Sequence, residues 1–305
     1  MAKFRKNHGS VKNAFLGMTI RIFLMIAISV ALFIFGFRGF QNSGSSSIDR
    51  SIDQTLFTDH DRSYLIPVTD RSDIEVVNHR YYSVGYVEQY EQAAWVCYVL
   101  NKFELVIPNV ERHDRFLEDP EVSSGSANYY DYRGSGYSRG HMAPAGDMAF
   151  NEEAMRQSFY MSNMSPQKIP FNGGIWRELE ETVRDWAYKN DRLYVITGPM
   201  LHTISEFVGQ KNKVGVPRKY YKAVLDAEGP EIKAIAFIME NEVSERPIMD
   251  YAVTIDELEE VLGMELYDQL LEDDIETQVE RTLEIDKWPV SKMRFDLRVK
   301  HWNNR

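Results

Sequence analysis

Two polar motifs and the amphipathic pattern that overlaps the second constrain the fold of this chain more than any other feature. The first motif is YSRGH, residues 137–141, and the second is SNMSPQKIPFNGGIWRELEETVRDW, residues 162–186. The second segment ends in apolar residues spaced by three, four and three positions, which predicts a helix with one buried face. These residues are Trp176, Leu179, Val183 and Trp186.

The first motif carries residue types suited to cutting a phosphodiester. That reaction needs a base that deprotonates water, a cation, and a donor to the phosphate oxygens. His141 can be the base, because an imidazole is largely neutral at pH 7. Arg139, two residues earlier, would share its strand face and offers a guanidinium fork to phosphate. Gly140 between them permits close approach of backbone or ligand.

The second motif carries oxygen ligands for a divalent ion. Asn172 precedes Gly-Gly-Ile-Trp, where the helix pattern begins, so we expect it near the helix N-cap. Glu180 falls on the flank of the apolar stripe and can face a cleft. Mg²⁺ prefers oxygen ligands and retains waters, so one amide oxygen and one carboxylate form a plausible site.

Each of these residues also has an ordinary structural interpretation. A single histidine such as His141 is usually structural or exposed. Asn172 alone can be a helix cap, Glu180 alone a solvated helix charge, and Asn163 a turn residue before Met-Ser-Pro-Gln. Their ordered combination favours metal-assisted hydrolysis.

The ordered motifs resemble those of the DNA/RNA non-specific endonucleases, a family that includes secreted bacterial nucleases and mitochondrial endonuclease G. The similarity extends from about Tyr81 to Leu262, and it includes the downstream segments VITGP, VGVP and YYK. The resemblance implies a ββα-metal active site, Mg²⁺ or in its place Mn²⁺, and DNA and RNA as substrates. Homodimers occur among relatives, so a homodimer is an open alternative.

The resemblance also implies a role for each motif residue. His141 would be the general base, Arg139 would stabilise the pentacovalent phosphorus, and Asn172 would bind the metal directly. Glu180 would position a metal-bound water, and Asn163 would contact the substrate and help to hold the site.

Two further points concern the residues around the phosphate. An upstream arginine is also expected there, and Arg112 and Arg115 in VERHDRFLEDP are both candidates. Ser138 occupies the position at which the family usually has aspartate. A serine still accepts a hydrogen bond but brings no charge, which bears on the catalytic rate more than on the type of reaction.

The N-terminal part of the chain predicts a membrane anchor. Residues 1–13 are basic, and residues 14–37 are apolar apart from Arg21. A run of more than about 20 apolar residues can span a bilayer, and no cleavage site is obvious after it. We therefore expect a cytoplasmic N-terminus, a single-pass signal anchor and a periplasmic or extracellular domain. A mitochondrial inner-membrane location is the alternative that the family suggests.

The remaining chain predicts a tether and one catalytic domain. Residues 38–73 include the Gly/Ser-rich QNSGSSS and are expected to form a tether or stalk, although residues 51–73 could instead extend the domain. Residues 74–305 fit a single α+β domain, with a mostly antiparallel sheet carrying the ββα unit. Aromatic and β-branched runs predict strands at 81–87, 94–100, 192–197, 218–226 and 233–239, and an acidic start predicts a helix at 254–262.

The charge distribution leaves a second functional class open. The formal net charge is −11, whereas nucleic-acid binders are more often basic. The segment KNKVGVPRKYYK concentrates cations, which either line the catalytic cleft or belong to a solvated strand edge. If they line the cleft, salt should strongly inhibit cleavage of the nucleic acid. The net charge and Ser138 together motivate the alternative of a catalytically weakened nuclease-like domain that binds nucleic acid or a protein partner. Cys97 has no partner cysteine and is expected in the core.

Overall fold

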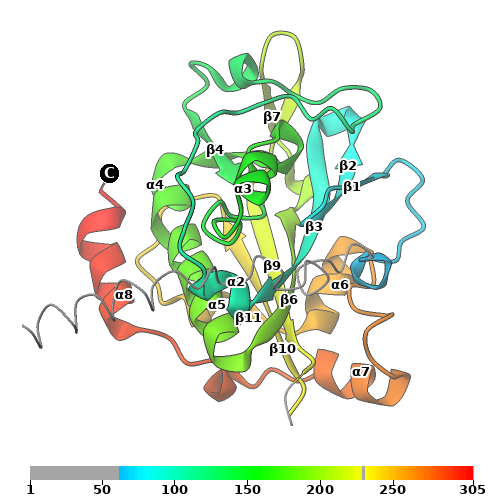
Figure 1. Cartoon of the computed structure of the whole chain (residues 1–305), viewed down its shortest axis with the longest axis vertical. Helices are drawn as coiled ribbons and strands as arrows, with labels where there is room; N and C mark the ends of the chain where they lie inside the picture. The colour runs from blue at the N-terminus through cyan, green and yellow to red at the C-terminus, as the bar shows by residue number, and fades with distance from the viewer. Residues whose placement is uncertain (1–61, 229–230, 305) are drawn as a thin grey trace, which may run out of the picture. The chain divides into compact units, whose positions relative to one another are not determined.

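A computed structural model describes residues 62–228 and 231–304 (Figure 1). The predicted basic segment 1–13, the anchor 14–37 and most of the tether lie outside these residues. Within the described ranges, no helix is both long and apolar enough to cross a bilayer. The described chain has the predicted α+β architecture with a mainly antiparallel sheet.

A seven-stranded antiparallel sheet forms the centre of the domain, in the order β1-β2-β3-β6-β9-β10-β11. The strands are β1 Glu75–Asn78, β2 Ser83–Val87, β3 Gln92–Asn101, β6 Arg192–Pro199, β9 Lys219–Asp226, β10 Lys233–Glu240 and β11 Ala252–Val253. The five strands predicted from aromatic and β-branched runs are thus confirmed to within a few residues at each end. A separate two-stranded ribbon joins β7 Glu206–Val208 to β8 Val214–Val216.

The sheet is buried on both faces because its strands direct alternate side chains to two different hydrophobic cores. In β3, Val96 and Tyr98 enter the core that also contains Trp186 of the long helix α5, Arg177–Asn190. Trp95 and Cys97 enter the opposite core, and Cys97 is confirmed as a buried core residue.

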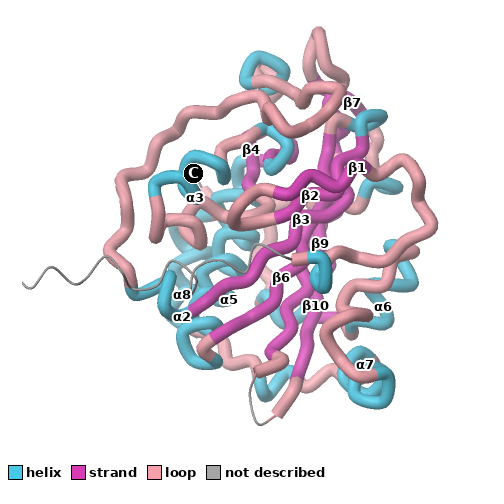
Figure 2. The backbone as a smooth tube through the Cα atoms, turned by 45° about the vertical axis from the view of Figure 1, so that its right-hand side comes forward, coloured by secondary structure: helices cyan, strands magenta, loops and turns pink. Residues whose placement is uncertain are grey.

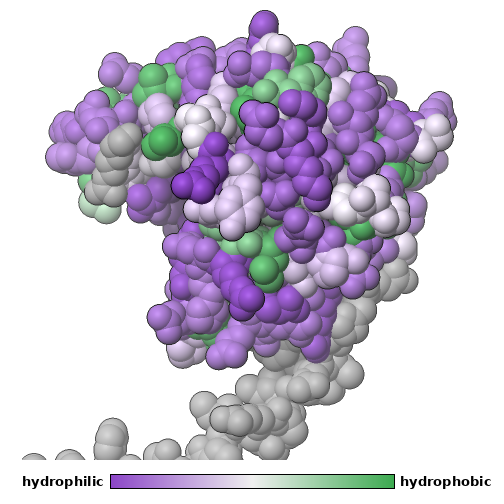
Figure 3. Space-filling model, turned by 90° about the horizontal axis from the view of Figure 1, so that it is seen from above, coloured by the Kyte–Doolittle hydropathy of each residue, from purple (hydrophilic) through white to green (hydrophobic). Residues whose placement is uncertain are grey.

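Helices cover the two faces of the sheet (Figure 2). α5 packs on one face of the sheet. α6 Ile255–Leu262 packs on the other face, and α7 Asp273–Glu280 contacts α6. The predicted helix at 254–262 is confirmed, with Thr254 as its N-cap in a capping box with Glu257. The shorter helices are α2 Lys102–Val106, α3 Glu152–Ser158 and α8 Lys292–Leu297. The face drawn in Figure 3 is mostly hydrophilic, with hydrophobic residues in small groups.

A further pair of strands, β4 and β5, carries the first motif and leads into α5; we call this pair the hairpin. β4 Tyr137–His141 pairs antiparallel with β5 Met164–Lys168, so that Ser138 lies opposite Gln167. The chain then continues through α4 Ile169–Phe171 and a π turn, Asn172–Trp176, into α5. This strand–strand–helix unit is the predicted ββα arrangement.

The predicted N-cap position of Asn172 was wrong. The helical run starts at Ile169, and Asn172 has helical φ and ψ of −58° and −50°. Pro170 suits the first turn, where its missing N–H has no intrahelical partner in any case. The distortion comes two residues later, because Gly174 has non-helical φ and ψ of −106° and −111°. Asn172 therefore precedes a kink inside the helical run.

The domain begins before residue 74. Leu65 is fully buried in the core that contains α6, and Val68 forms a bridge with Glu265. Arg62 is buried and donates to the carbonyl of Arg80 at 2.9 Å. For residues 62–73, the structure therefore supports a packed extension of the domain over a free stalk.

The C-terminal segment supports α5 from outside. Arg298, which is fully buried, donates to the carboxylate of Glu178 in α5 and to the Arg246 carbonyl at 2.6 Å. Trp302 stacks on the guanidinium of Arg177, with 3.9 Å from the guanidinium carbon to the ring centroid. The helix that supplies Glu180 is thus held by residues more than a hundred positions away in sequence.

We predict that Arg298→Met destabilises the domain by about 3–5 kcal/mol, because it leaves the Glu178 carboxylate buried without its partner. Urea-induced unfolding measures this change. The double variant Arg298→Met/Glu178→Leu should recover most of the loss, since an apolar pair can replace a buried ion pair. A double variant as unstable as the single one would show that the ion pair is not the cause.

Candidate active site

One cleft of about 420 Å³ brings together residues from both sequence motifs. Its walls come from β4, from the loop after it, and from the π turn and first half of α5. Four of the predicted catalytic and metal residues line it, namely Arg139, His141, Asn172 and Glu180. His141 and Asn172, which come from different motifs, therefore line the same cleft.

His141 ends β4 and lies in an apolar and positively charged environment. Its ring packs edge-on against Phe159, with 4.8 Å between ring centroids. Its Nε2 atom is buried and makes no hydrogen bond to any described residue. Burial, with the charges of Arg112 and Arg139, lowers the pKa of His141 to about 3. The imidazole is therefore neutral at physiological pH.

The Asn172 amide is oriented by Ser138. The Ser138 hydroxyl lies 2.8 Å from the Gln167 carbonyl oxygen and donates its only hydrogen to it. Towards Asn172, 2.9 Å away, the hydroxyl can therefore only accept, so the amide must present Nδ2 to it. This leaves Oδ1 of Asn172 without a donor among the described residues, and Ser138 performs the orienting role with no negative charge.

Glu180 is half-buried and belongs to a group of four charged side chains. The other three are Lys222, Arg184 and Asp147, which are buried or half-buried. Burial raises the pKa of its carboxyl, an effect opposed by the positive charges of Lys222 and Arg184. Arg184 donates to Asp147 at 2.6 Å, and Asp147 also accepts from the Tyr98 hydroxyl at 2.8 Å. Glu180 has no hydrogen bond or ion pair with any described residue, so its oxygens remain free to bind.

Arg139 is held by aromatic rings. Its guanidinium carbon lies 4.3 Å from the Phe116 ring centroid and 4.5 Å from that of Tyr129. No carboxylate within the described ranges forms an ion pair with it. Stacking fixes the plane of the guanidinium while its N–H groups stay available to a phosphate.

Gly140 is required by the close packing of the hairpin. A Cβ at this position would lie 1.9 Å from Oε1 of Gln167. The predicted close approach is therefore made by a side chain of the neighbouring strand.

Asn163 is fully buried and does not line the cleft, so the substrate contact predicted for it lacks the necessary exposure. Its side chain accepts from the Ala143 N–H at 2.9 Å and donates to the Ala143 and Ser158 carbonyls. With all three bonds made inside the protein, Asn163 holds the loop that follows His141. This agrees with the other role proposed for it, which is to maintain the site.

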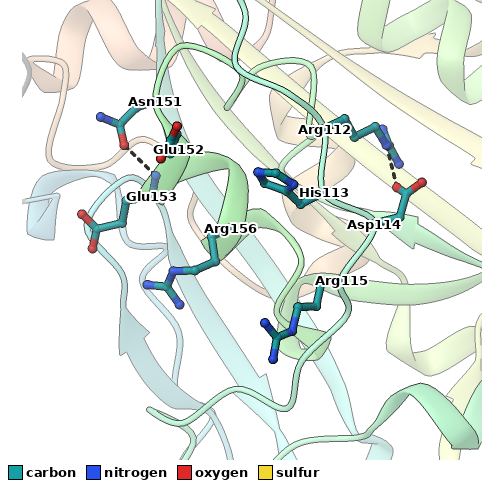
Figure 4. A pocket seen from close by; sticks show the side chains of 8 residues that line it. All are labelled: Arg112, His113, Asp114, Arg115, Asn151, Glu152, Glu153 and Arg156. Carbon is teal, nitrogen blue, oxygen red and sulfur yellow. Dashed lines mark hydrogen bonds and ion pairs between the residues drawn. The ribbon is translucent and has the colours of Figure 1, made fainter.

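The structure separates the two candidate arginines of the upstream loop. Arg112 lines the cleft beside His141, and it also lines a neighbouring pocket of about 1040 Å³. Arg115 lines that second pocket and not the cleft, and the second pocket is also lined by Arg156 of α3 and the acids Glu152 and Glu153 (Figure 4). Arg112 is therefore the arginine placed to contact a phosphate near His141.

The basic segment KNKVGVPRKYYK does not line the cleft. Lys219 pairs with Glu240 at 3.0 Å, and Arg218 borders a different pocket, on the side of β9 near Glu242. Lys222 points into the core that contains Trp176, with its ammonium 5.0 Å from that ring. The alternation of side chains along β9 decides this, because Lys222 falls on the same face as the buried Tyr220 and Val224.

Sequence reasoning missed Arg177 and Arg184, and it considered Lys222 only as one cation of the basic segment, without a link to Glu180. Arg184 lies one helical turn after Glu180, so the i, i+4 spacing could have placed it in the cleft. Lys222 carried no local signal, since its approach to Glu180 depends on the packing of α5 on β9. These cations supply the local positive charge that the net charge of −11 conceals.

The donor set fits a hard divalent ion. Oδ1 of Asn172 and the Glu180 carboxylate are oxygen donors free of other partners, and they line one cleft. Mg²⁺ is typically bound by one or two such ligands together with waters and substrate phosphates. The geometry therefore offers a place for a metal ion next to His141.

Comparison with known proteins identifies a family of similar chains. Residues 63–273 match the sequence model of the family described as DNA/RNA non-specific endonuclease. The chain is similar to Nuclease C1 of Cunninghamella echinulata var. echinulata, with 39% identity over 172 residues, which is 52% of this chain and 68% of that protein. It is also similar to the mitochondrial nuclease EXOG of Xenopus laevis, with 31% identity over 68% of this chain and 61% of the relative.

Two further matches concern endonuclease G. Human mitochondrial endonuclease G is 31% identical over 60% of this chain and 66% of its own length. A solved structure of an EndoG/EndoGI complex matches with a TM-score of 0.61 and 28% identity, covering 68% of this chain and 90% of that chain. The chain thus spans less than two thirds of the length of the mitochondrial relatives named here.

We predict that Ser138→Ala weakens the binding of a divalent ion by about 10–100-fold, because the Asn172 amide loses the acceptor that fixes its orientation. Isothermal titration with Mn²⁺ measures the affinity. Ser138→Thr keeps the hydroxyl and is the matched control, with affinity expected near that of the parent. Unchanged affinity in Ser138→Ala would show that Ser138 does not orient the ligand.

Proposed function

We propose, since the chain belongs to the DNA/RNA non-specific endonuclease family, that it cuts phosphodiester bonds of DNA and RNA with the aid of a divalent metal ion. The observation that carries the proposal is the meeting of His141, Arg139, Asn172 and Glu180 in one cleft. They supply a neutral base, a phosphate donor and two oxygen ligands.

His141 acts as the general base on the attacking water. Its pKa in the free protein is low partly because Arg112 and Arg139 stand near it. A phosphate bound between these arginines would cancel much of their charge and make the imidazole more basic at the moment when it must accept a proton. Arg139 then donates to the charge that develops on the phosphate oxygens.

Asn172 and Glu180 hold the metal. A bound divalent ion would neutralise phosphate charge and stabilise the leaving oxygen. Oxygen-only donors favour Mg²⁺, and Mn²⁺ accepts the same ligands. Lys222, buried behind Glu180, favours the ionised form of that carboxylate and so maintains its ability to bind.

The proposed substrate range follows from what lines the cleft. Its cationic side chains are the arginines Arg112, Arg139, Arg177 and Arg184, which suit phosphate oxygens. Contacts to phosphate position a nucleic acid without selecting a sequence. We therefore assign little sequence specificity, and both DNA and RNA as substrates.

The alternative of a catalytically weakened binding domain rests on Ser138 and on the net charge. Ser138 retains the hydrogen bond to Asn172, and the cleft carries its own arginines despite the overall charge. Both observations favour the enzyme.

We also propose the membrane location that the sequence indicates, with residues 14–37 as a single-pass anchor and the catalytic domain on the periplasmic or extracellular side. The support is the basic N-terminus followed by the apolar run. Alkaline extraction should leave the full-length chain in the membrane fraction, and its release into the soluble fraction would contradict the anchor.

We predict that His141→Ala lowers plasmid cleavage by about 10²–10⁴-fold, because the water loses its base. Cleavage of supercoiled plasmid, single-stranded DNA and RNA in Mg²⁺ measures this loss, and EDTA should abolish cutting by the parent protein. His202→Ala removes an exposed histidine outside the cleft and is the control. Folded His141→Ala protein with the activity of the parent would remove this residue from the mechanism.

We predict that salt inhibits cleavage and that Arg112, more than Arg115, contributes to this dependence. Loss of one phosphate contact lowers the slope of log KM against log salt by about one. Arg112→Ala should show this change together with a lower kcat, whereas Arg115→Ala removes the same charge from the same loop but not from the cleft. A larger effect of Arg115→Ala on both quantities would reverse the assignment.

A further inference from the structure

A second group of carboxylates lies on the other face of the sheet from the cleft. Asp256 and Glu259 of α6 and Glu280 of α7 each place one oxygen within 4.8 Å of the others. Figure 1 shows α6 and α7 on the side of the sheet away from β4, α4 and α5. This carboxylate triad is therefore separate from the proposed catalytic site.

Two members of the triad are buried. Glu259 is 7% exposed and Glu280 is 6% exposed. One oxygen of Glu259 accepts the Leu266 N–H at 2.7 Å. The Oε1 atom of Glu280 has no hydrogen-bond partner among the described residues, although a buried carboxylate oxygen left unpaired is costly.

The surroundings add negative charge rather than compensating it. The acids that face Glu280 are Glu259, Asp256, Glu276 and Glu265, and together with burial they raise its pKa to about 8. Burial and neighbouring acids also raise the pKa of Glu259 to about 7. The single ion pair that the structure gives the triad joins Asp256 to the exposed Arg281 at 3.1 Å.

The spacing of the oxygens suits one ion. Calcium binds oxygens at about 2.3–2.6 Å, so two ligands on opposite sides of it lie about 5 Å apart and neighbouring ligands lie closer. Oxygens that all lie within 4.8 Å of one another can therefore reach a common centre. Calcium also accepts flexible geometry and bidentate carboxylates, whereas Mg²⁺ requires near-octahedral geometry at about 2.0–2.1 Å.

We propose that Asp256, Glu259 and Glu280 bind one calcium ion that joins α6 to α7. The ion binds the Glu280 carboxylate, one oxygen of which has no hydrogen-bond partner among the described residues. It also neutralises the negative charge of a triad that has a single ion pair within those residues. Its role is structural, because α6 covers the core opposite the cleft and α7 contributes to that core through Val279. The acidic stretch between residues 256 and 284 thereby acquires a function that nuclease chemistry does not give it.

Thermal unfolding of the whole chain with CaCl₂, MgCl₂ or EGTA tests the proposal. Saturating calcium should raise Tm by about 5–10 °C over the EGTA sample, since a ligand that binds only the folded state stabilises it. In equilibrium dialysis with radioactive calcium, Glu280→Gln should bind one calcium ion fewer per chain than the parent. This substitution keeps the shape of the side chain. The calcium-dependent rise in Tm should disappear in the same variant.

Two control variants separate this site from its surroundings. Asp274→Asn removes an exposed acid from α7 and should keep the calcium response. Asn172→Ala alters the proposed catalytic metal ligand and should also keep it. A calcium response retained in Glu280→Gln overturns the proposal, as does a parent chain that shows no calcium response. An equal rise with Mg²⁺ overturns the choice of calcium.

Discussion

The two hydrogen bonds of the Ser138 hydroxyl join the halves of the cleft. By donating to the Gln167 carbonyl, the hydroxyl fixes its own direction on the hairpin, and by accepting from Asn172 it fixes the amide of the helical segment. The hairpin carries His141, the proposed base, and Arg139, whereas the helical segment carries Asn172 and Glu180, the proposed metal ligands. A neutral side chain thus aligns two elements with separate chemical roles. The aspartate usual in the family would accept the same bond with added charge.

Electrostatics differ between the two faces of the sheet. On the cleft face, the arginines and the buried Lys222 surround the few acids that face them. On the opposite face, acids gather around Glu259 and Glu280 with few cations. A net charge of −11 therefore says little about the surface that meets a phosphate backbone. Local arrangement decides which ligands each face can bind, and here it favours a polyanion on one face and a cation on the other.

Strands and helices were predicted from the sequence more accurately than the points at which one element passes into the next. Strands such as β3 and β6 were found because aromatic and β-branched residues concentrate there. The position of Asn172 was misjudged because the two following glycines suggested a helix start, whereas the helical run begins earlier at Ile169. At the kink, Gly174 also packs closely against a residue that is distant in sequence, since a Cβ there would lie 2.7 Å from Oδ1 of Asn303. Local pattern does not contain that information.

The same limit applies to the candidate site. Motif order identified His141, Arg139, Asn172 and Glu180, but not Lys222, whose orientation depends on how α5 packs over β9. We propose that Asn172 and Glu180 hold a divalent ion beside His141, and anomalous diffraction from crystals grown with Mn²⁺ would locate such an ion. A manganese peak should appear in the cleft, within about 2.0–2.5 Å of Oδ1 of Asn172. A fully loaded crystal with no manganese at that atom would contradict it.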